Sequence, residues 1–446
     1  MTDTDSLTFE VPVDAAAHVA SRYARFAAVD RAEAFITLRP EADVALELNA
    51  VLARRRAGEP LPLAGLLFAV KGNIDIAGID TTAGCPAFAY SPAADATVVA
   101  RLRAAGAVVL GSTNLDQFAT GLVGTRSPYG AMRHATDPTR ISGGSSSGSA
   151  VAVATGFADF ALGTDTAGSG RVPAAFHGLV GLKPTKGWVP ATGVVPACRT
   201  QDVVSVMSAS LDMASLVVGI MAGVDAGDPL SRAAPAGDAP GVGGGCGSRP
   251  ARIGVPLPGQ LGELAPGWAA AFDAAVERHR RAGHEIVEVD VQPFLDTARM
   301  LYEGAFVAER YAAVGEFIDA HPGEVDPTVQ AIIGGAREIP AHRLYRDLER
   351  LEGYVLVAAG VFSGVDALLL PTTVQHPTLA AVAADPLGVN GTLGRFTNFA
   401  NLLDLAALAI PAGIVDGLPF GVQLVGPAFS DGRLADLARD VLEVSA

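Results

Sequence analysis

Residues 143–185 read GGSSSGSAVAVATGFADFALGTDTAGSGRVPAAFHGLVGLKPT, and this stretch carries most of the information in the sequence. Two clusters of small and hydroxyl residues flank an apolar segment long enough for one helix and one strand. A helix is expected from Ser149 onward, so the first cluster lies at a positive helix N-terminus. The second cluster, Gly163–Arg171, follows the expected strand, where its backbone amides are suited to an oxyanion hole. Structural turns have the same composition, so the clusters alone leave both interpretations open.

One short motif inside this stretch suggests a different enzyme class. Gly144–Gly148 matches G-x-S-x-G, the nucleophile elbow of α/β-hydrolases. That motif requires a strand directly before the serine, followed later by an acid and a histidine. The preceding residues, RHATDPTRISGG, are typical of a loop, so the elbow interpretation is disfavoured.

Composition excludes several classes of protein. The 446 residues are 50% apolar and carry a formal net charge of −15, so the chain has material for a large core, and its acidity disfavours nucleic-acid and membrane-surface partners. The three cysteines match neither a disulfide framework nor a metal spacing. The N-terminus lacks the features of a secretory signal. The apolar stretch Val203–Gly223 is interpreted as a buried helix, and a cytoplasmic location is expected.

Lysine is rare in this sequence. The only lysines are Lys71, Lys183 and Lys186, and the other 29 basic residues are arginine. A leftover of mutational bias is one explanation. The other is chemical, because a buried lysine amine can lose its proton whereas a guanidinium cannot.

Periodicity predicts alternating helices and short strands. Helices are expected over 15–29 and 41–55, a strand in the second half of 61–71, a helix over 95–105 with Asp95 as N-cap, and a strand over 107–111. Later strands are expected at 253–256, 285–291 and 365–370, with helices over 266–283 and from about 294 to 358. Residues 1–60 form a predicted N-terminal helical segment packed on a main domain of residues 61–446. Gly, Pro and Ala dominate about 223–251, which predicts a flexible insertion.

Three segments together resemble the amidase signature family. They are residues 143–185, FAVKGNIDIAG (68–78) and TNLDQFATGLVGTRSPYG (113–130), and the similarity extends from about residue 60 to the C-terminus. The resemblance implies an α/β fold, in which a large mixed twisted sheet is covered by helices on both faces. It also implies amide hydrolysis without metal or cofactor, by a homodimer.

The family's Ser–cis-Ser–Lys triad maps onto Ser169, Ser145 and Lys71. Ser169 would attack the amide carbonyl, Ser145 would relay the proton, and neutral Lys71 would be the final base. Burial behind the apolar strand would lower the pKa of Lys71 toward neutrality. The resemblance further implies a cis peptide bond at Ser145 and an oxyanion hole of backbone amides from Thr166, Ala167, Gly168 and Ser169. Taken singly, these residues also suit a surface lysine, a turn serine and a helix cap.

Several neighbouring residues have predicted roles or unusual identities. Arg171 is expected to tie down the nucleophile loop, and Lys183 and Lys186 are expected to be structural or surface residues. Gly72 replaces the aspartate that many relatives have after the catalytic lysine, which concerns the support of Lys71. Cys85 suggests a nitrilase, but no suitably spaced glutamate accompanies Lys71.

Resemblance to the allophanate hydrolase subgroup indicates the substrate. TNLDQFATGLVGTRSPYG and the later YEGAFVAERYAAVGEF carry it, and it implies that Tyr302 and Arg310 hold a small anionic amide, allophanate, with a backbone contact from Gly121. Eight residues of helix separate the first two by about 12 Å, and Gly304 would help them converge. The alternatives are an amidase for another small amide, or the amide-hydrolysing subunit of a tRNA-dependent amidotransferase.

Overall fold

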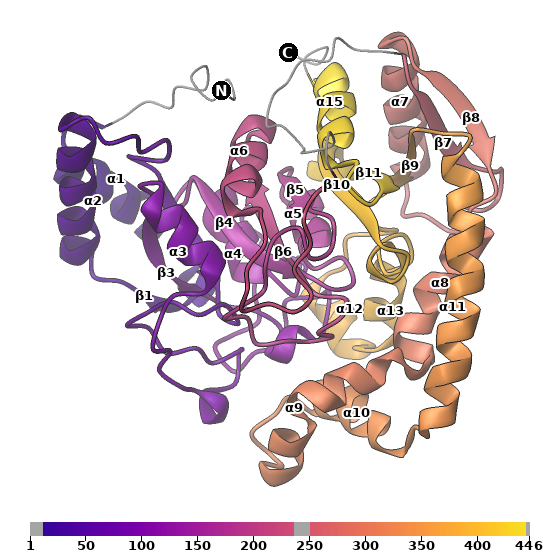
Figure 1. The fold of residues 1–446 in the computed structure, drawn as a ribbon, viewed down its shortest axis with the longest axis horizontal. Coiled ribbons are helices and arrows are strands. Elements are labelled where there is room, and N and C mark those ends of the chain that lie inside the picture. Colours follow the sequence, from indigo (N-terminus) through magenta and orange to yellow (C-terminus); the bar gives the residue numbers. More distant parts are fainter. Residues whose placement is uncertain (1–11, 236–249, 443–446) are drawn as a thin grey trace.

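A single mixed sheet of eleven strands organises the chain, in a computed structural model that describes residues 12–235 and 250–442. The strand order is β1-β3-β2-β4-β6-β5-β10-β11-β9-β7-β8. In Figure 1 the strands form a twisted band that runs from β1 and β3 on the left to β8 on the upper right. The strands are β1 Phe35–Leu38, β2 Leu67–Lys71, β3 Val108–Thr113, β4 Phe160–Asp165, β5 Val180–Lys183, β6 Val203–Ser208, β7 Arg252–Pro256, β8 Glu285–Val289, β9 Ala367–Pro371, β10 Leu405–Val415 and β11 Leu418–Pro427.

Pairing within the sheet is parallel in two places and antiparallel between them. β2 pairs in parallel with β3 and β4, and β7 pairs in parallel with β8 and β9. The central strands β4, β6, β5, β10, β11 and β9 pair antiparallel in that order. Parallel strands need crossover connections, which the helices supply. The predicted mixed α/β sheet is therefore confirmed.

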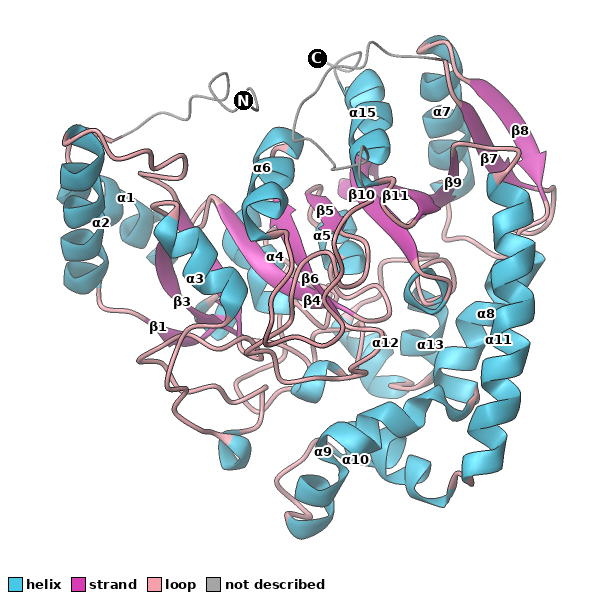
Figure 2. Ribbon diagram, viewed as in Figure 1, coloured by secondary structure: helices cyan, strands magenta, loops and turns pink. Residues whose placement is uncertain are grey.

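Fifteen α-helices occur in the described part of the chain. They are α1 Ala15–Ala27, α2 Glu41–Arg56, α3 Thr97–Ala104, α4 Ser147–Ala154, α5 Arg171–Phe176, α6 Leu211–Met221, α7 Trp268–Arg281, α8 Gln292–Glu303, α9 Ala308–Ala320, α10 Pro327–Gly334, α11 Ala341–Phe362, α12 Leu379–Ala384, α13 Gly388–Leu393, α14 Phe399–Leu402 and α15 Asp431–Leu442. In Figure 2 the loops between these elements gather below the central strands. None of these helices has the length and apolar character needed to cross a membrane.

Both faces of the sheet are buried, because side chains alternate along each strand. On β2, Phe68 and Val70 join one apolar cluster with α3, α6, α7 and α15, whereas Leu67 and Ala69 join another with α1, α2 and α4. At the other end of the sheet, Leu368 and Leu370 of β9 pack with α8, α11 and α14. Helices therefore cover both faces, as predicted.

Two details of the predicted elements are wrong. Residues 203–223 are strand β6 followed by helix α6 rather than one helix. Helix α3 begins at Thr97 after Ala96, and the Asp95 carboxylate accepts the Ala77 amide instead of capping the helix. The helices predicted from about 294 to 358 are present as α8, α9, α10 and α11.

The predicted N-terminal segment and the predicted insertion both contact the rest of the protein. The N-terminal segment contains β1, which extends the sheet by pairing antiparallel with β3. In the predicted insertion, Asp228 accepts the Ala191 amide, and Arg232 donates to the Asp404 carboxylate. Residues 236–249 of that insertion lie outside the described part of the chain.

Candidate active site

Lys71 ends strand β2 and is completely buried. Its Nζ donates to Ser145 Oγ and to Thr164 Oγ1, both at 2.7 Å. Burial disfavours the charged amine and lowers the pKa of Lys71 from 10.5 to about 7, although the carboxylates of Asp116, Asp202 and Asp165 oppose that change. A large fraction of Lys71 is therefore neutral near pH 7, as a base must be.

Ser145 lies in the turn that leads into helix α4, and the Gly144–Ser145 peptide bond is cis, as the family resemblance implied. The Ser145 carbonyl accepts the Asp116 amide at 3.2 Å. A side chain at Gly144 would place its Cβ 2.3 Å from Asp116 Oδ2 and 2.6 Å from the Gly124 nitrogen. Glycine is required at position 144 because the Asp116 loop packs directly on this turn.

Ser169 lies in the loop between β4 and α5 and is 2% exposed. Its hydroxyl donates to the Gly121 carbonyl over 3.4 Å. Among the described residues, no hydrogen bond joins the Ser169 and Ser145 hydroxyls directly. The Ser145 hydroxyl instead meets Lys71, so transfer of a proton from Ser169 requires rotation of the Ser169 side chain toward Ser145.

A buried ion pair holds the Ser169 loop in place. The Arg171 guanidinium donates to both oxygens of Asp165 at 2.9 and 3.0 Å, and both side chains are fully buried. Burial by itself would raise the pKa of Asp165, but Arg171 more than offsets this and the pKa lies below its usual value. Arg171 also donates to Gln423 Oε1 and to the Thr397 carbonyl. The prediction that Arg171 ties down the nucleophile loop is confirmed.

The proposed oxyanion amides differ in their partners. The Gly168 amide donates to Asp165 Oδ1 at 2.8 Å, and its role as an oxyanion donor stays a prediction. Within the described part of the chain, the amides of Thr166, Ala167 and Ser169 have no hydrogen-bond acceptor. Three amides of the same loop thus remain for a developing oxyanion.

Tyr302 and Arg310 meet as the sequence suggested. Helix α8 ends at Glu303, Gly304 follows in extended conformation, and the chain turns before α9 begins. Arg310 Nη2 donates to the Tyr302 hydroxyl at 3.0 Å, and its Nη1 donates to Thr120 Oγ1 at 2.8 Å. Thr120 precedes Gly121, whose carbonyl accepts the Ser169 hydroxyl. Arg310 therefore links the pair to the loop beside Ser169.

Arg310 has an unusual electrostatic environment. Its side chain is 0% exposed, and its Nε is buried without a partner. None of the ion pairs formed by the described residues includes Arg310. Burial disfavours the Arg310 charge, and the Asp202 carboxylate attracts it without forming an ion pair, so a bound anion would supply a direct partner.

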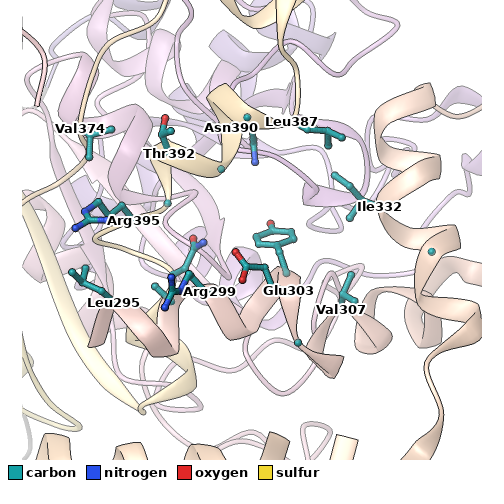
Figure 3. A pocket seen from close by; sticks show the side chains of 18 of the residues that line it. Leu295, Arg299, Glu303, Val307, Ile332, Val374, Leu387, Asn390, Thr392 and Arg395 are labelled. Carbon is teal, nitrogen blue, oxygen red and sulfur yellow. The ribbon is translucent and has the colours of Figure 1, made fainter. Parts of the chain in front are cut away.

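A cavity of about 880 Å³ lies on the other side of Tyr302. Helix α8 forms one wall and residues 387–398 form the opposite wall. Figure 3 shows Arg299 and Glu303 reaching in from α8, with Asn390 and Thr392 across from them. Tyr302 therefore lies between this cavity and Arg310.

Comparison with known proteins identifies the family. The model of the family described as Amidase matches residues 17–435, which is most of the chain. The chain belongs to the amidase family. Its relatives include a urea amidolyase of Lachancea kluyveri, 45% identical over 419 residues that cover 92% of this amidase and 22% of the relative. This amidase therefore spans about a fifth of that relative's length.

Two further relatives are matched over most of their own length. A glutamyl-tRNA(Gln) amidotransferase subunit of Symbiobacterium thermophilum is 36% identical over 458 residues, covering 94% of this amidase and 91% of the relative. The solved structure of Kluyveromyces lactis allophanate hydrolase superimposes with a TM-score of 0.88 at 41% identity, covering 96% of this amidase and 70% of that chain.

Sequence reasoning missed two buried carboxylates that position this site. Asp116 accepts the amides of Val123, Gly124 and Arg126, which fixes the loop after Gly121. Asp202 accepts the Thr166 hydroxyl and the amides of Ala197 and Cys198. Burial raises the pKa of both carboxyl groups above the usual value. Asp116 lies within TNLDQFATG, so its place in that motif was the available signal.

The other residues that the sequence analysis singled out form hydrogen bonds with nearby protein groups. Lys183 is fully buried, burial lowers its pKa to about 7, and its Nζ donates to the Pro184 carbonyl. Lys186 Nζ donates to Gln201 Oε1. The Cys85 thiol donates to the Glu324 carbonyl at 3.4 Å. Among the residues described, no group of three His, Cys, Asp or Glu side chains is arranged to hold a metal ion.

Gly72 has a packing explanation. A Cβ at this position would lie 2.9 Å from both Ile36 Cδ1 and the Thr113 carbonyl oxygen. The space that a carboxylate would need beside Lys71 is filled by the N-terminal segment and strand β3.

Proposed function

We propose that this amidase hydrolyses allophanate, or urea-1-carboxylate, through Ser169, Ser145 and Lys71. The single observation that carries the proposal is Arg310, a fully buried guanidinium with no carboxylate partner among the described residues. Allophanate brings a carboxylate joined to a urea group, so it supplies both the missing negative charge and a scissile amide. The similarity to allophanate hydrolase supports the same substrate.

In the proposed reaction, Ser169 Oγ attacks the terminal carbonyl carbon of allophanate. Its proton passes to the Ser145 hydroxyl as that hydroxyl gives its own proton to neutral Lys71, 2.7 Å away. The oxyanion is stabilised by the free amides of Thr166, Ala167 and Ser169. Collapse breaks the C–N bond, and Lys71 returns the proton through Ser145 to the leaving amine, which departs as ammonia.

Water completes the cycle by attacking the acyl-enzyme. The same proton path, run through Ser145 to Lys71, removes a proton from the water and returns it to Ser169 Oγ. The product is N-carboxycarbamate, which decarboxylates. Desolvated Lys71 is suited to both halves of the cycle because its pKa of about 7 permits it to accept and to return a proton.

Arg310 and Tyr302 would select the anionic substrate. A guanidinium has five N–H donors, and among the described residues Arg310 donates to three acceptors, Ala119 O, Thr120 Oγ1 and Tyr302 OH. Donors thus remain for a carboxylate, and a charge-assisted pair in a buried site is stronger than one in water. Neutral amides of similar shape would leave the Arg310 charge unpaired.

Ammonia release tests the proposal. Purified protein is assayed with allophanate, malonamate, biuret, urea and phenylacetamide, with Ser169→Ala as the blank. We expect rapid turnover of allophanate, none in the blank, and loss of at least tenfold in kcat/KM for Arg310→Met on allophanate alone. Arg350→Ala is the matched control, because Arg350 donates to Tyr354 on the exposed side of α11. Turnover of a neutral amide only, or an unchanged Arg310→Met variant, contradicts the proposed substrate.

A second candidate is the hydrolytic subunit of an amidotransferase. It is favoured by the 36% identity with a glutamyl-tRNA(Gln) amidotransferase subunit over 91% of that protein. Such a protein would hydrolyse glutamine only with partner proteins. This function would be favoured over allophanate hydrolysis if the isolated protein hydrolysed none of the small amides and gained glutamine hydrolysis when partner subunits were added.

A further inference from the structure

Asn398 occupies a helix N-cap position without capping the helix. It immediately precedes α14 with a helical backbone (φ −63°, ψ −26°), so its side chain makes no capping bond to the first turn. The side chain is part of a residue that is only 8% exposed, and its Oδ1 is buried without a partner. Its carboxamide makes no hydrogen bond to any other described residue. The unpaired Oδ1 is an acceptor, whereas Nδ2 carries two N–H donors that none of the described residues accepts, so Nδ2 is free to bind an acceptor on a ligand.

Two other asparagine side chains in this region form hydrogen bonds with the protein. Asn390 Oδ1 accepts the Leu122 amide at 2.8 Å. Asn401 Nδ2 donates to the carbonyls of Asp165 and Gln201 at 2.6 and 2.7 Å. Both side chains join segments that are distant in sequence, whereas the Asn398 carboxamide joins none.

The backbone at Asn398 is fixed to the nucleophile loop. The preceding residue, Thr397, donates from Oγ1 to the Ala167 carbonyl at 2.6 Å, and its own carbonyl accepts Arg171 Nη2 at 3.0 Å. The Asn398 amide donates to the Gly394 carbonyl at 3.0 Å. The residue before Asn398 is therefore tied to the loop that carries Ser169.

The carboxamide lies in a space left for it beside the cavity. Asn398 and Tyr302 both line the 880 Å³ cavity whose two walls are seen in Figure 3. A Cβ on Gly394 would lie 2.3 Å from Asn398 Oδ1 and 2.5 Å from Nδ2, so the absence of a side chain at position 394 makes room for the amide. A neutral donor is thereby placed on the cavity side of the Tyr302–Arg310 pair.

We propose that Asn398 is a substrate-binding residue whose Nδ2 donates a hydrogen bond to the carboxylate of the anionic amide. The inference rests on the proposed function, since it assigns a second contact to the same substrate. A carboxylate accepts about four hydrogen bonds, more than the remaining Arg310 donors satisfy. A neutral amide supplies another donor without adding a second buried charge, which would itself need compensation.

Two substitutions and a matched substrate pair test this assignment. Biuret has a carboxamide where allophanate has a carboxylate, so the ratio of kcat/KM on the two substrates measures recognition of the anionic end. We expect Asn398→Ala to lower kcat/KM on allophanate about 10- to 100-fold, mainly through KM, and to change biuret turnover little. Asn398→Asp should lower it further on allophanate, because its carboxylate repels the substrate. Gln292→Ala is the control, since Gln292 lines the same cavity but donates to Asp296.

A binding measurement separates failure of this inference from failure of the proposed function. Calorimetry of malonamate with the Ser169→Ala protein needs no turnover, and Asn398→Ala added to that background should weaken binding by the same factor. Unchanged affinity, or no binding of malonamate to Ser169→Ala, overturns the inference. An equal fall in kcat/KM of Asn398→Ala on allophanate and on biuret also overturns the inference, because it would place the Asn398 carboxamide against a part that both substrates share. Absence of allophanate turnover in the unmodified protein, with malonamate affinity still dependent on Asn398, would refute only the proposed reaction.

Discussion

The pKa of Lys71 leads to a quantitative prediction about the pH dependence of the reaction. Burial lowers that pKa from 10.5 to about 7, so the neutral amine is about half of the population at pH 7. An unperturbed lysine would be neutral in only about one molecule in 3,000 at that pH. Since the neutral form is the base, kcat/KM should fall as the pH falls through 7. From pH 6 to pH 8 it should rise about tenfold and then level off, whereas a pKa of 10.5 gives a rise of about a hundredfold without a plateau.

The assay is ammonia release at substrate concentrations well below KM, at half-unit steps from pH 5.5 to 9. Lys71→Arg keeps a positive charge but cannot lose its proton, so we expect a loss of about 10²–10⁴ in kcat/KM. The residual activity should lose the tenfold rise. Lys186→Arg is the matched control, because the Lys186 side chain donates to Gln201 Oε1 and to none of the triad residues, so this variant should keep both the rate and the profile. A flat wild-type profile between pH 6 and 8, or an active Lys71→Arg variant, would refute the assignment of Lys71 as base.

Three further predictions concern the scaffold. Burial lowers the pKa of His376 to about 3, so below pH 6.5 the unfolded chain binds a proton that the folded protein does not. The free energy of unfolding should therefore fall by about 2 kcal/mol between pH 7 and pH 5. Urea unfolding at both pH values should show a smaller fall for His376→Phe, and an identical fall would contradict the reasoning. Arg171→Met leaves Asp165 buried and unpaired, so the free energy of unfolding should drop by about 3–5 kcal/mol, and a change below 1 kcal/mol would be inconsistent with the ion pair. Gly72→Asp should cost about 1–3 kcal/mol in thermal or urea unfolding because its Cβ meets the Thr113 carbonyl, and Ile36→Val should not restore the loss; a neutral effect would mean that the backbone yields.

Local sequence was informative where chemistry is concentrated in short segments. The two small-residue clusters place Ser145 just before helix α4 and Ser169 just after strand β4, as the order of the clusters along the chain indicated. The scarcity of lysine drew attention to Lys71, which is fully buried. Residues 203–223 were predicted less well, because a fully buried strand lacks the alternation that distinguishes it from a buried helix.

The sequence by itself determined the family, the mixed α/β class and the identities of the candidate triad, because these depend on residue types at short spacing. Only the tertiary structure decided which of those groups are free to act. Among the residues described, the Gly168 amide donates to Asp165, Arg310 forms no ion pair, and the Asn398 carboxamide has no hydrogen-bond partner. Each of these facts depends on which distant segments pack together and on what they leave unpaired. Desolvation and hydrogen bonding are properties of the packed site, and no local pattern of residues specifies them.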